Sequence, residues 1–86
     1  MDWEVYILEC SDGTLYTGIS NNLPSRIEKH NSGNGAKYTK NRIPVALVYK
    51  ETLKNKSESL KREIEIKRLT RSQKLDLIDS IDLATT

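Results

Sequence analysis

The side chains best suited to chemistry include two tyrosines on neighbouring predicted strands. Tyr6 lies in the segment 3–10 and Tyr16 in the segment 15–19, with a short turn between them. Both phenols can lie on one side of a sheet if the register of the pairing allows it. A phenol can position a water molecule or accept a proton from it, although half-buried strand tyrosines without a chemical role are more common.

A second pair of polar side chains lies on a predicted helix. Arg26 and His30 are four positions apart, so they share one helical face. The arginine fork can bind phosphate oxygens, and a histidine can accept or relay a proton near neutral pH. The alternative is an exposed polar helix face. His30 is the only histidine, which restricts the metal and acid–base schemes that the chain can support.

The carboxylates and the single cysteine limit the kinds of metal site that the chain can form. Glu63 lies in the middle of another predicted helix, where it is either a solvated residue beside the apolar stripe or a ligand for a hard cation. One carboxylate with several waters is a plausible Mg²⁺ site, because Mg²⁺ gives up its hydration reluctantly. Cys10 is the only cysteine, which excludes a disulfide within the chain and a multi-cysteine zinc site.

Charge is unevenly distributed along the chain, although the net charge is only +2. Residues 1–20 carry acidic side chains and no Lys or Arg, whereas residues 21–50 are strongly basic and the remainder is nearly balanced. A positive middle segment suits a surface that binds phosphates, and a solvated basic loop is the alternative. Within it, Gly33, Gly35 and Lys37 resemble a phosphate-binding loop only loosely and do not form the P-loop pattern.

The strands that must position the tyrosines are joined by a tight turn. The segments 3–10 and 15–19 are rich in β-branched and aromatic residues, which favours strands. Asp12 and Gly13 between them form the strongest short hairpin signal. Gly18 interrupts the second strand, and a glycine there marks a bulge or a close approach of the backbone.

A helix and a third strand follow the hairpin. The helix is expected to begin near Asn22 and to end near His30, with Leu23 and Ile27 facing the core. A polar, glycine-containing loop comes next. Residues 45–49 are continuously apolar, which predicts a strand buried on both faces at the centre of the sheet.

A second predicted helix carries Glu63. It begins at Asn55, and its apolar stripe is formed by Leu60 and Ile64, with Ile66 and Leu69 as further candidates.

A short third helix completes the predicted order. Residues 70–73 repeat the capping pattern, and the helix carries Leu75 and Ile78. The order ββαβαα predicts an α+β fold with a small, three-stranded, mostly antiparallel sheet flanked by helices. We expect one domain over residues 1–78 and a frayed tail over residues 79–86.

The beginning of the chain does not resemble a signal peptide, and no apolar stretch approaches the length that spans a bilayer. With its lone cysteine, the chain is expected to be cytoplasmic and to have no membrane partner.

Taken together, these residues resemble the GIY-YIG nuclease superfamily. The likeness is greatest to its small stand-alone bacterial members, which are related to the catalytic domain of structure-specific endonucleases. The two motifs of the family name correspond to Val5-Tyr6-Ile7 and Tyr16-Thr17-Gly18, with Val5 in place of glycine and Thr17 in place of isoleucine. The likeness covers about residues 3–78 and continues through Arg26, His30-Asn31, the segment 33–39, the strand VALVYKE and the helical sequence EIEIKRLTRSQK.

The resemblance implies a metal-dependent endonuclease that hydrolyses DNA phosphodiester bonds, with repair or recombination as a candidate setting. In this interpretation a phenol, Tyr6 first and Tyr16 second, acts as general base or positions water. Arg26 stabilises the transition state, and His30 orients the phenol or relays its proton. Glu63 holds one Mg²⁺ or Mn²⁺, and Gly18 belongs to the structural motif. The expected DNA contacts are Lys37, Lys40 and Arg42 on the backbone and Tyr38 on a sugar or base.

Two other classes of function fit the same pattern. The chain could be a nucleic-acid-binding module that keeps the fold with little or no turnover and needs a protein partner for targeting. It could also be a structural or protein-interaction domain, in which the tyrosines and Glu63 are merely half-buried. A cleavage assay with and without Glu63 separates the first alternative, and an NMR titration with Mg²⁺ separates the second.

Overall fold

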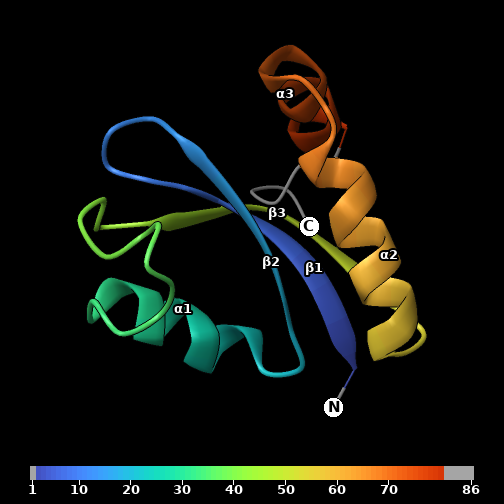
Figure 1. The fold of residues 1–86 in the computed structure, drawn as a ribbon, viewed down its shortest axis with the longest axis horizontal. Coiled ribbons are helices and arrows are strands. Elements are labelled where there is room, and N and C mark those ends of the chain that lie inside the picture. The colour runs from blue at the N-terminus through green and yellow to red at the C-terminus, as the bar shows by residue number, and fades with distance from the viewer. Residues whose placement is uncertain (1, 81–86) are drawn as a thin grey trace.

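The computed structural model describes residues 2–80 and shows an antiparallel sheet between helices on both faces (Figure 1). The element order, which confirms the predicted ββαβαα α+β fold, is β1 (Trp3–Glu9), β2 (Leu15–Ser20), α1 (Leu23–Asn31), β3 (Ala46–Leu53), α2 (Lys56–Lys67) and α3 (Arg71–Asp79). Residues 81–86, which form most of the predicted frayed tail, lie outside the described residues. None of the helices described is long and apolar enough to cross a membrane.

β1 is the central strand of the sheet, whose order is β2-β1-β3. The prediction that residues 45–49 form the central strand is therefore wrong. β3 begins only at Ala46 and exposes both Ala46 and Lys50, as an edge strand can. The continuous buried run belongs to β1, where Val5 to Leu8 are all buried because helices cover the sheet on both sides.

The β1–β2 turn forms as its sequence predicts. The Asp12 carboxylate accepts hydrogen bonds from the backbone N–H of Thr14 at 3.1 Å and from its hydroxyl at 2.6 Å. Gly13 has a φ of +82°, a left-handed conformation that glycine adopts without strain. The turn therefore fixes the register of the two strands that carry the tyrosines.

Each face of the sheet has its own apolar core. On one face, α1 contributes Leu23 and Ile27, as predicted, and packs them against Tyr6 and Leu8 of β1. On the other face, α2 and α3 cover Val5 and Ile7, the alternate residues of the same strand. Figure 1 shows the same arrangement, with α1 on one side of the sheet and α2 on the other.

α2 buries a different face from the one predicted. Leu60 and Ile64 are 41% and 49% exposed, whereas Ser59 and Ile66 are completely buried. The predicted stripe is wrong for Leu60 and Ile64 and correct for Ile66. The prediction considers only apolar side chains and therefore misses Ser59. Ser59 is small, so the helix can lie close to the sheet at this position. The buried row 59–63–66 includes Glu63, whose side chain is only 18% exposed.

α3 starts with the capping box that its sequence predicts. The Thr70 hydroxyl accepts from the backbone N–H of Gln73 at 3.2 Å, and the Gln73 amide oxygen accepts from the N–H of Thr70 at 2.9 Å. Leu77 and Ile78 pack against the second core. Leu75, the other apolar residue that the sequence assigns to this helix, is exposed.

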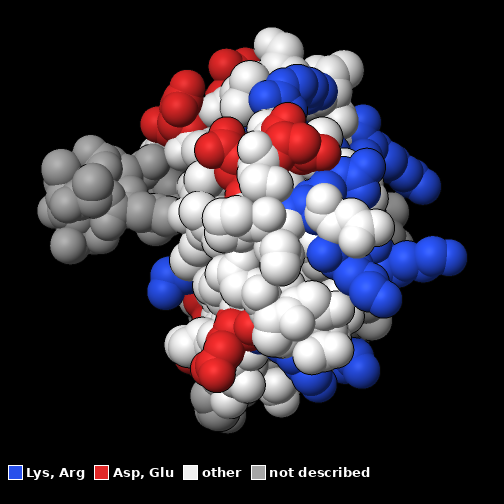
Figure 2. Space-filling view, turned by 90° about the vertical axis from the view of Figure 1, so that its left-hand side faces the viewer, with Lys and Arg blue, Asp and Glu red and all other residues white. Residues whose placement is uncertain are grey.

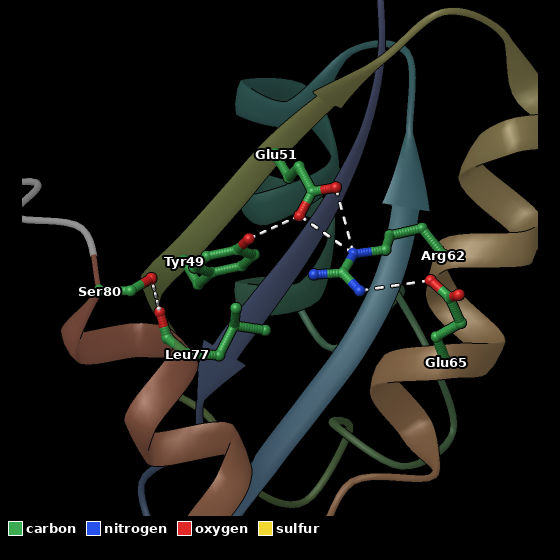
Figure 3. A network of polar contacts seen from close by, with 6 residues as sticks. All are labelled: Tyr49, Glu51, Arg62, Glu65, Leu77 and Ser80. Carbon is green, nitrogen blue, oxygen red and sulfur yellow. Dashed lines mark hydrogen bonds and ion pairs between the residues drawn. The ribbon is translucent and has the colours of Figure 1, made fainter.

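A polar network ties α2 to β3 (Figure 3). The Glu51 carboxylate accepts hydrogen bonds from the Tyr49 hydroxyl at 2.6 Å and from Arg62 Nε at 3.1 Å. Arg62 also contacts Glu65 at 3.2 Å. Partly exposed ion pairs contribute little to stability. The pair of Arg62 and Glu51 holds α2 beside β3, and Arg62 immediately precedes Glu63 in the sequence.

Candidate active site

The strand register brings the two predicted tyrosines onto one face of the sheet. Tyr6 lies opposite Gly18 and Leu8 lies opposite Tyr16. Because alternate residues share a face, Tyr6 and Tyr16 are diagonal neighbours. Their ring centroids are 6.4 Å apart. Gly18 produces no bulge in this pairing, and its predicted role as a close backbone approach is confirmed, because the Tyr6 ring lies against it.

His30 joins the tyrosines from the last turn of α1. It is completely buried, and its Nε2 lies 2.9 Å from the hydroxyl oxygen of Tyr6. The imidazole also meets the Tyr16 ring edge-on, with the centroids 5.2 Å apart. The structure therefore brings Tyr6, Tyr16 and His30 into one cluster between α1 and the sheet.

Thr39 completes this cluster and was missed by the sequence reasoning. It is fully buried, and its hydroxyl oxygen lies 2.8 Å from Nδ1 of His30. Gly35 makes the contact possible, since a β-carbon there would collide with Nδ1 of His30 and lie 2.7 Å from its Cα. Thr39 lies in a loop whose sequence has no periodic pattern. The only sequence signal for its role is that a glycine and a threonine follow His30 within a few residues.

The hydrogen bonds around Thr39 indicate the tautomer of His30. The Thr39 hydroxyl lies 3.1 Å from the Ala36 carbonyl oxygen, in a geometry that suits donation to it. A hydroxyl has a single proton, so a Thr39 that donates to Ala36 must accept from the Nδ1–H of His30. Nε2 then carries the lone pair and accepts the hydrogen bond from the Tyr6 hydroxyl.

Charged groups from two helices act on this cluster. Burial raises the pKa of the Tyr6 phenol, the half-buried Arg26 guanidinium opposes the rise, and the Tyr16 phenol and the Glu63 carboxylate add to it. Burial lowers the pKa of His30, and the positive charge of Arg26 lowers it further. The charges of Arg26 and Glu63 therefore both act on the ionisation of Tyr6. Burial and the charge of Arg26 both favour the neutral form of His30.

Glu63 lies on α2, which contacts the edge strand β2 as well as β1. Its carboxylate is paired with Lys67 one turn later, at 3.6 Å. Lys67 and Tyr16 line the same surface hollow, which places this part of α2 beside Tyr16. Among residues 2–80, no group of three or more His, Cys, Asp or Glu side chains could enclose a metal ion. Any cation held by these residues would therefore have fewer than three protein ligands of these kinds.

The predicted DNA-binding residues lie in the loop between α1 and β3. Lys37, Tyr38 and Lys40 are exposed. Arg42 is more constrained, because its guanidinium lies 4.2 Å from the centroid of the Tyr38 ring and its Nε donates to Asp12 at 3.0 Å. Figure 2 views the side of the molecule that carries this loop, and Lys and Arg side chains gather along one edge of that face.

Asn31 has a structural role beside the site. Its side-chain amide donates to the Val45 carbonyl oxygen at 3.2 Å, and its amide oxygen accepts from the Val45 N–H at 2.6 Å. Asn31 thereby pairs with Val45 as a strand residue would, and it ties the end of α1 to the segment that leads into β3. This contact helps to hold α1, and with it His30, against the sheet.

Comparisons with known proteins agree with the fold. Residues 2–76 match the family model of the GIY-YIG catalytic domain. UPF0213 proteins from several Staphylococcus aureus strains are 62% identical over 74 residues, which cover 86% of this chain and 90% of each relative.

Two solved structures are also similar. The solution NMR structure of the UPF0213 protein BH0048 from Bacillus halodurans is 41% identical with a TM-score of 0.59, and the match covers 100% of both chains. That of the protein EF2693 from E. faecalis is 36% identical with a TM-score of 0.64, and the match covers 93% of this chain and 85% of that one. This chain therefore belongs to the GIY-YIG family, which is a nuclease family.

Proposed function

We propose that this chain is an endonuclease that hydrolyses DNA phosphodiester bonds with the help of a divalent cation. Its reaction centre would comprise Tyr6, Tyr16, Arg26, His30 and Glu63. The observation that carries the proposal is the buried 2.9 Å contact between the Tyr6 hydroxyl and His30 Nε2, on which the charges of Arg26 and Glu63 both act. Titratable groups with shifted pKa values that meet at one point are typical of active sites.

The proton path of this mechanism runs from water through Tyr6 to His30. As water attacks phosphorus, its proton passes to the Tyr6 oxygen while the Tyr6 proton passes to Nε2 of His30. A free phenolate is never formed, which matters because burial raises the pKa of Tyr6. His30 can accept this proton, because burial and the charge of Arg26 lower its pKa and so favour its neutral form.

Thr39 serves this path as a positioning residue. It touches neither water nor phosphate in the mechanism and acts only through His30 Nδ1, at 2.8 Å. By accepting the Nδ1–H, Thr39 keeps the lone pair on Nε2, where the Tyr6 proton must arrive. The hydrogen bond that one ring nitrogen makes commonly decides whether the other nitrogen of a histidine is basic.

Arg26 and Tyr16 act on the phosphate side of the reaction. Arg26 donates N–H groups to the non-bridging oxygens and stabilises the negative charge that grows in the transition state. Tyr16 is only half-buried and lines an open hollow, so its phenol can hold the attacking water or a phosphate oxygen.

The side chains present suit a hydrated Mg²⁺ or Mn²⁺. Glu63 offers one largely buried carboxylate, and Mg²⁺ is commonly bound by one or two carboxylates together with waters and substrate phosphates. Zinc chemistry suits this part of the chain poorly, because the described residues provide no cluster of three ligands. When bound, the cation supplies charge stabilisation for the leaving 3′ oxygen. Glu63 must first release Lys67, which lies 3.6 Å away.

We place the activity in DNA repair or recombination, because the family resemblance extends to structure-specific endonucleases. A single small basic face gives weak and salt-sensitive binding. For this reason the proposal includes a protein partner that supplies targeting.

The test is a cleavage assay on branched and linear DNA over a series of Mg²⁺ and Mn²⁺ concentrations. We expect Glu63→Gln to abolish cutting and Glu58→Gln, an exposed carboxylate on the same helix, to leave it unchanged. Both variants should keep the NMR spectrum of the folded chain. Cation-independent cutting, or normal cutting by Glu63→Gln, would contradict the assignment of Glu63.

One observation favours the alternative of a binding module without turnover. The ion pair with Lys67 already neutralises Glu63 and would compete with a cation. In that case DNA binds with affinity that falls as salt increases, but no DNA is cut at any cation concentration. The assay above distinguishes this outcome from the proposed nuclease.

A further inference from the structure

Two adjoining hollows form a groove beside the candidate active site. The first is lined by Thr14, Leu15, Tyr38, Arg71 and Lys74, and the second by Leu15, Tyr16, Thr17, Tyr38, Lys67 and Lys74. Three of these residues, Leu15, Tyr38 and Lys74, belong to both hollows. The start of β2, the Tyr38 ring and the basic side chains of α2 and α3 therefore surround one continuous depression.

Every charged side chain that lines this groove is basic. Lys67 ends α2, and Arg71 and Lys74 lie on the first turn of α3, so the three cations come from both sides of one helix–helix turn. Lys67 is paired with Glu63, whereas Arg71 and Lys74 form no ion pair with any residue of the described range 2–80. A groove whose charged side chains are all cations attracts a polyanion.

Tyr38 provides an aromatic surface that is held in place before any ligand arrives. Its side chain is 41% exposed, yet the Arg42 guanidinium lies 4.2 Å from the ring centroid and Tyr16 lies 5.9 Å away, centroid to centroid. Arg42 also donates a hydrogen bond to the Tyr38 carbonyl oxygen at 2.8 Å. An exposed ring that is already fixed loses little conformational freedom when a planar ligand stacks on it.

The groove is continuous with the reaction centre. Tyr16 lines the groove and lies 5.2 Å from His30, ring to ring, and Lys67 of the groove contacts Glu63. A nucleic-acid strand whose phosphate lies at Tyr6 and Arg26 would therefore extend past Tyr38 along the three cations.

We propose that this groove binds an unpaired stretch of nucleic acid directly beside the scissile phosphate, with one base on Tyr38 and phosphates on Lys67, Arg71 and Lys74. The inference rests on the proposed function and adds to it a substrate class. A cationic groove with an exposed aromatic ring suits a single strand, because bases within a duplex are stacked on each other and cannot reach the ring. The preferred substrate then has a single-stranded segment next to the cut.

Binding without turnover tests this proposal separately from nuclease activity. In EDTA, fluorescence anisotropy compares a short single-stranded oligonucleotide with a blunt duplex of the same sequence and length. We expect the single strand to bind more tightly. Tyr38→Leu should weaken its binding at least about fivefold, because stacking on an aromatic ring contributes that much or more per base, and Tyr38→Phe should retain it.

The cations are tested with a matched control at the other end of the sheet. Arg71→Gln with Lys74→Gln should reduce the slope of log affinity against log salt by about 0.7 for each phosphate that is no longer neutralised. Lys54→Gln should leave affinity and slope unchanged, since Lys54 follows the end of β3 that pairs with Trp3, far from the start of β2.

The outcomes of these experiments distinguish a failure of the groove proposal from a failure of the proposed nuclease function. The proposal is overturned if duplex binds as tightly as single strand, or if the groove variants bind the single strand as the wild type does. A chain that binds single strands through these residues but never cuts them would refute the proposed function and leave the groove intact.

Discussion

Gly18 faces Tyr6 across the antiparallel pairing of β1 and β2, so closely that a β-carbon at Gly18 would lie 2.6 Å from the Tyr6 hydroxyl oxygen. The same β-carbon would lie 2.7 Å from Cζ of the ring and 3.1 Å from Cε2 of Tyr16. Tyr6 is only 1% exposed, so its ring has no free space to move into. Glycine at position 18 is therefore what lets the Tyr6 phenol reach His30.

Replacing Gly18 by alanine should displace the phenol without unfolding the chain. We expect a loss of stability of about 1–3 kcal/mol from overpacking. Single-turnover cleavage should slow at least about tenfold, since proton transfer through a misplaced phenol loses much of its general-base contribution. Chemical denaturation and cleavage kinetics measure the two effects. A Gly18→Ala chain with unchanged cleavage and an unchanged His30 imidazole spectrum would show that the contact does not matter.

Thr39→Val should change the tautomer of His30. The valine removes the acceptor for Nδ1–H while keeping the shape of the side chain, so the proton is expected to move to Nε2. Because the chain has one histidine, its imidazole ¹⁵N signals are free of overlap. An NMR spectrum should show Nδ1 protonated in the wild type and in Thr39→Ser, and Nε2 protonated in Thr39→Val.

Activity should follow the tautomer in these variants. Thr39→Ser keeps a hydroxyl at this position and should restore most of the cleavage that Thr39→Val removes. A Thr39→Val chain that keeps the wild-type tautomer would refute the positioning role of Thr39, whatever its activity.

Stability should decrease as the pH falls from 7 to 5. Burial and the charge of Arg26 lower the pKa of His30, so the folded chain binds this proton less readily than the unfolded chain does. The contribution is fully present above the unfolded pKa of about 6.5 and is lost as the pH falls from there through the folded pKa. The slope is limited to about 1.4 kcal/mol per pH unit for one proton.

Denaturation at several pH values measures this dependence. His30→Gln should flatten it between pH 7 and 5, because histidine is the side chain whose ordinary pKa lies in this window and His30 is the only histidine of the chain. An equally steep dependence in His30→Gln would mean that other groups cause it.

Two isoleucines on α2 provide a matched test of how this helix packs. Ile66 is completely buried, whereas Ile64, two positions earlier, is 49% exposed. Ile66→Ala should lower the free energy of unfolding by about 2–5 kcal/mol, and Ile64→Ala by less than about 1 kcal/mol. Urea denaturation measures both. Equal losses would mean that α2 is turned differently from the arrangement described above.

Local signals predict most of the fold. The turn at Asp12 and Gly13 and the capping box of Thr70 and Gln73 form within a few residues, so their chemistry is visible in the sequence. Packing is harder to predict. The apolar start of β3 wrongly indicates a central strand, and the apolar residues Leu60 and Ile64 wrongly indicate the buried stripe of α2. Both errors arise because burial depends on which elements meet, and a small residue such as Ser59 carries no apolar signal.

The sequence predicts the candidate site where the spacing of residues along a helix or strand determines which side chains share a face. Arg26 and His30 share a helical face, and Tyr6 and Tyr16 share a sheet face once the turn fixes the register. The assignment of Glu63 to the candidate site follows only from the family resemblance, because the sequence does not show how two helices lie around a sheet. Thr39 lies in an irregular loop, where no period predicts a contact with a histidine nine positions earlier.

The most direct test of the central claim is a double-mutant cycle on Tyr6 and His30, measured by single-turnover cleavage. If the two side chains form one proton path, Tyr6→Phe and His30→Gln should each slow cleavage about 100-fold or more, and the double variant should be hardly slower than either single variant. Wild-type cleavage by Tyr6→Phe, or losses that simply multiply in the double variant, would contradict the proton path.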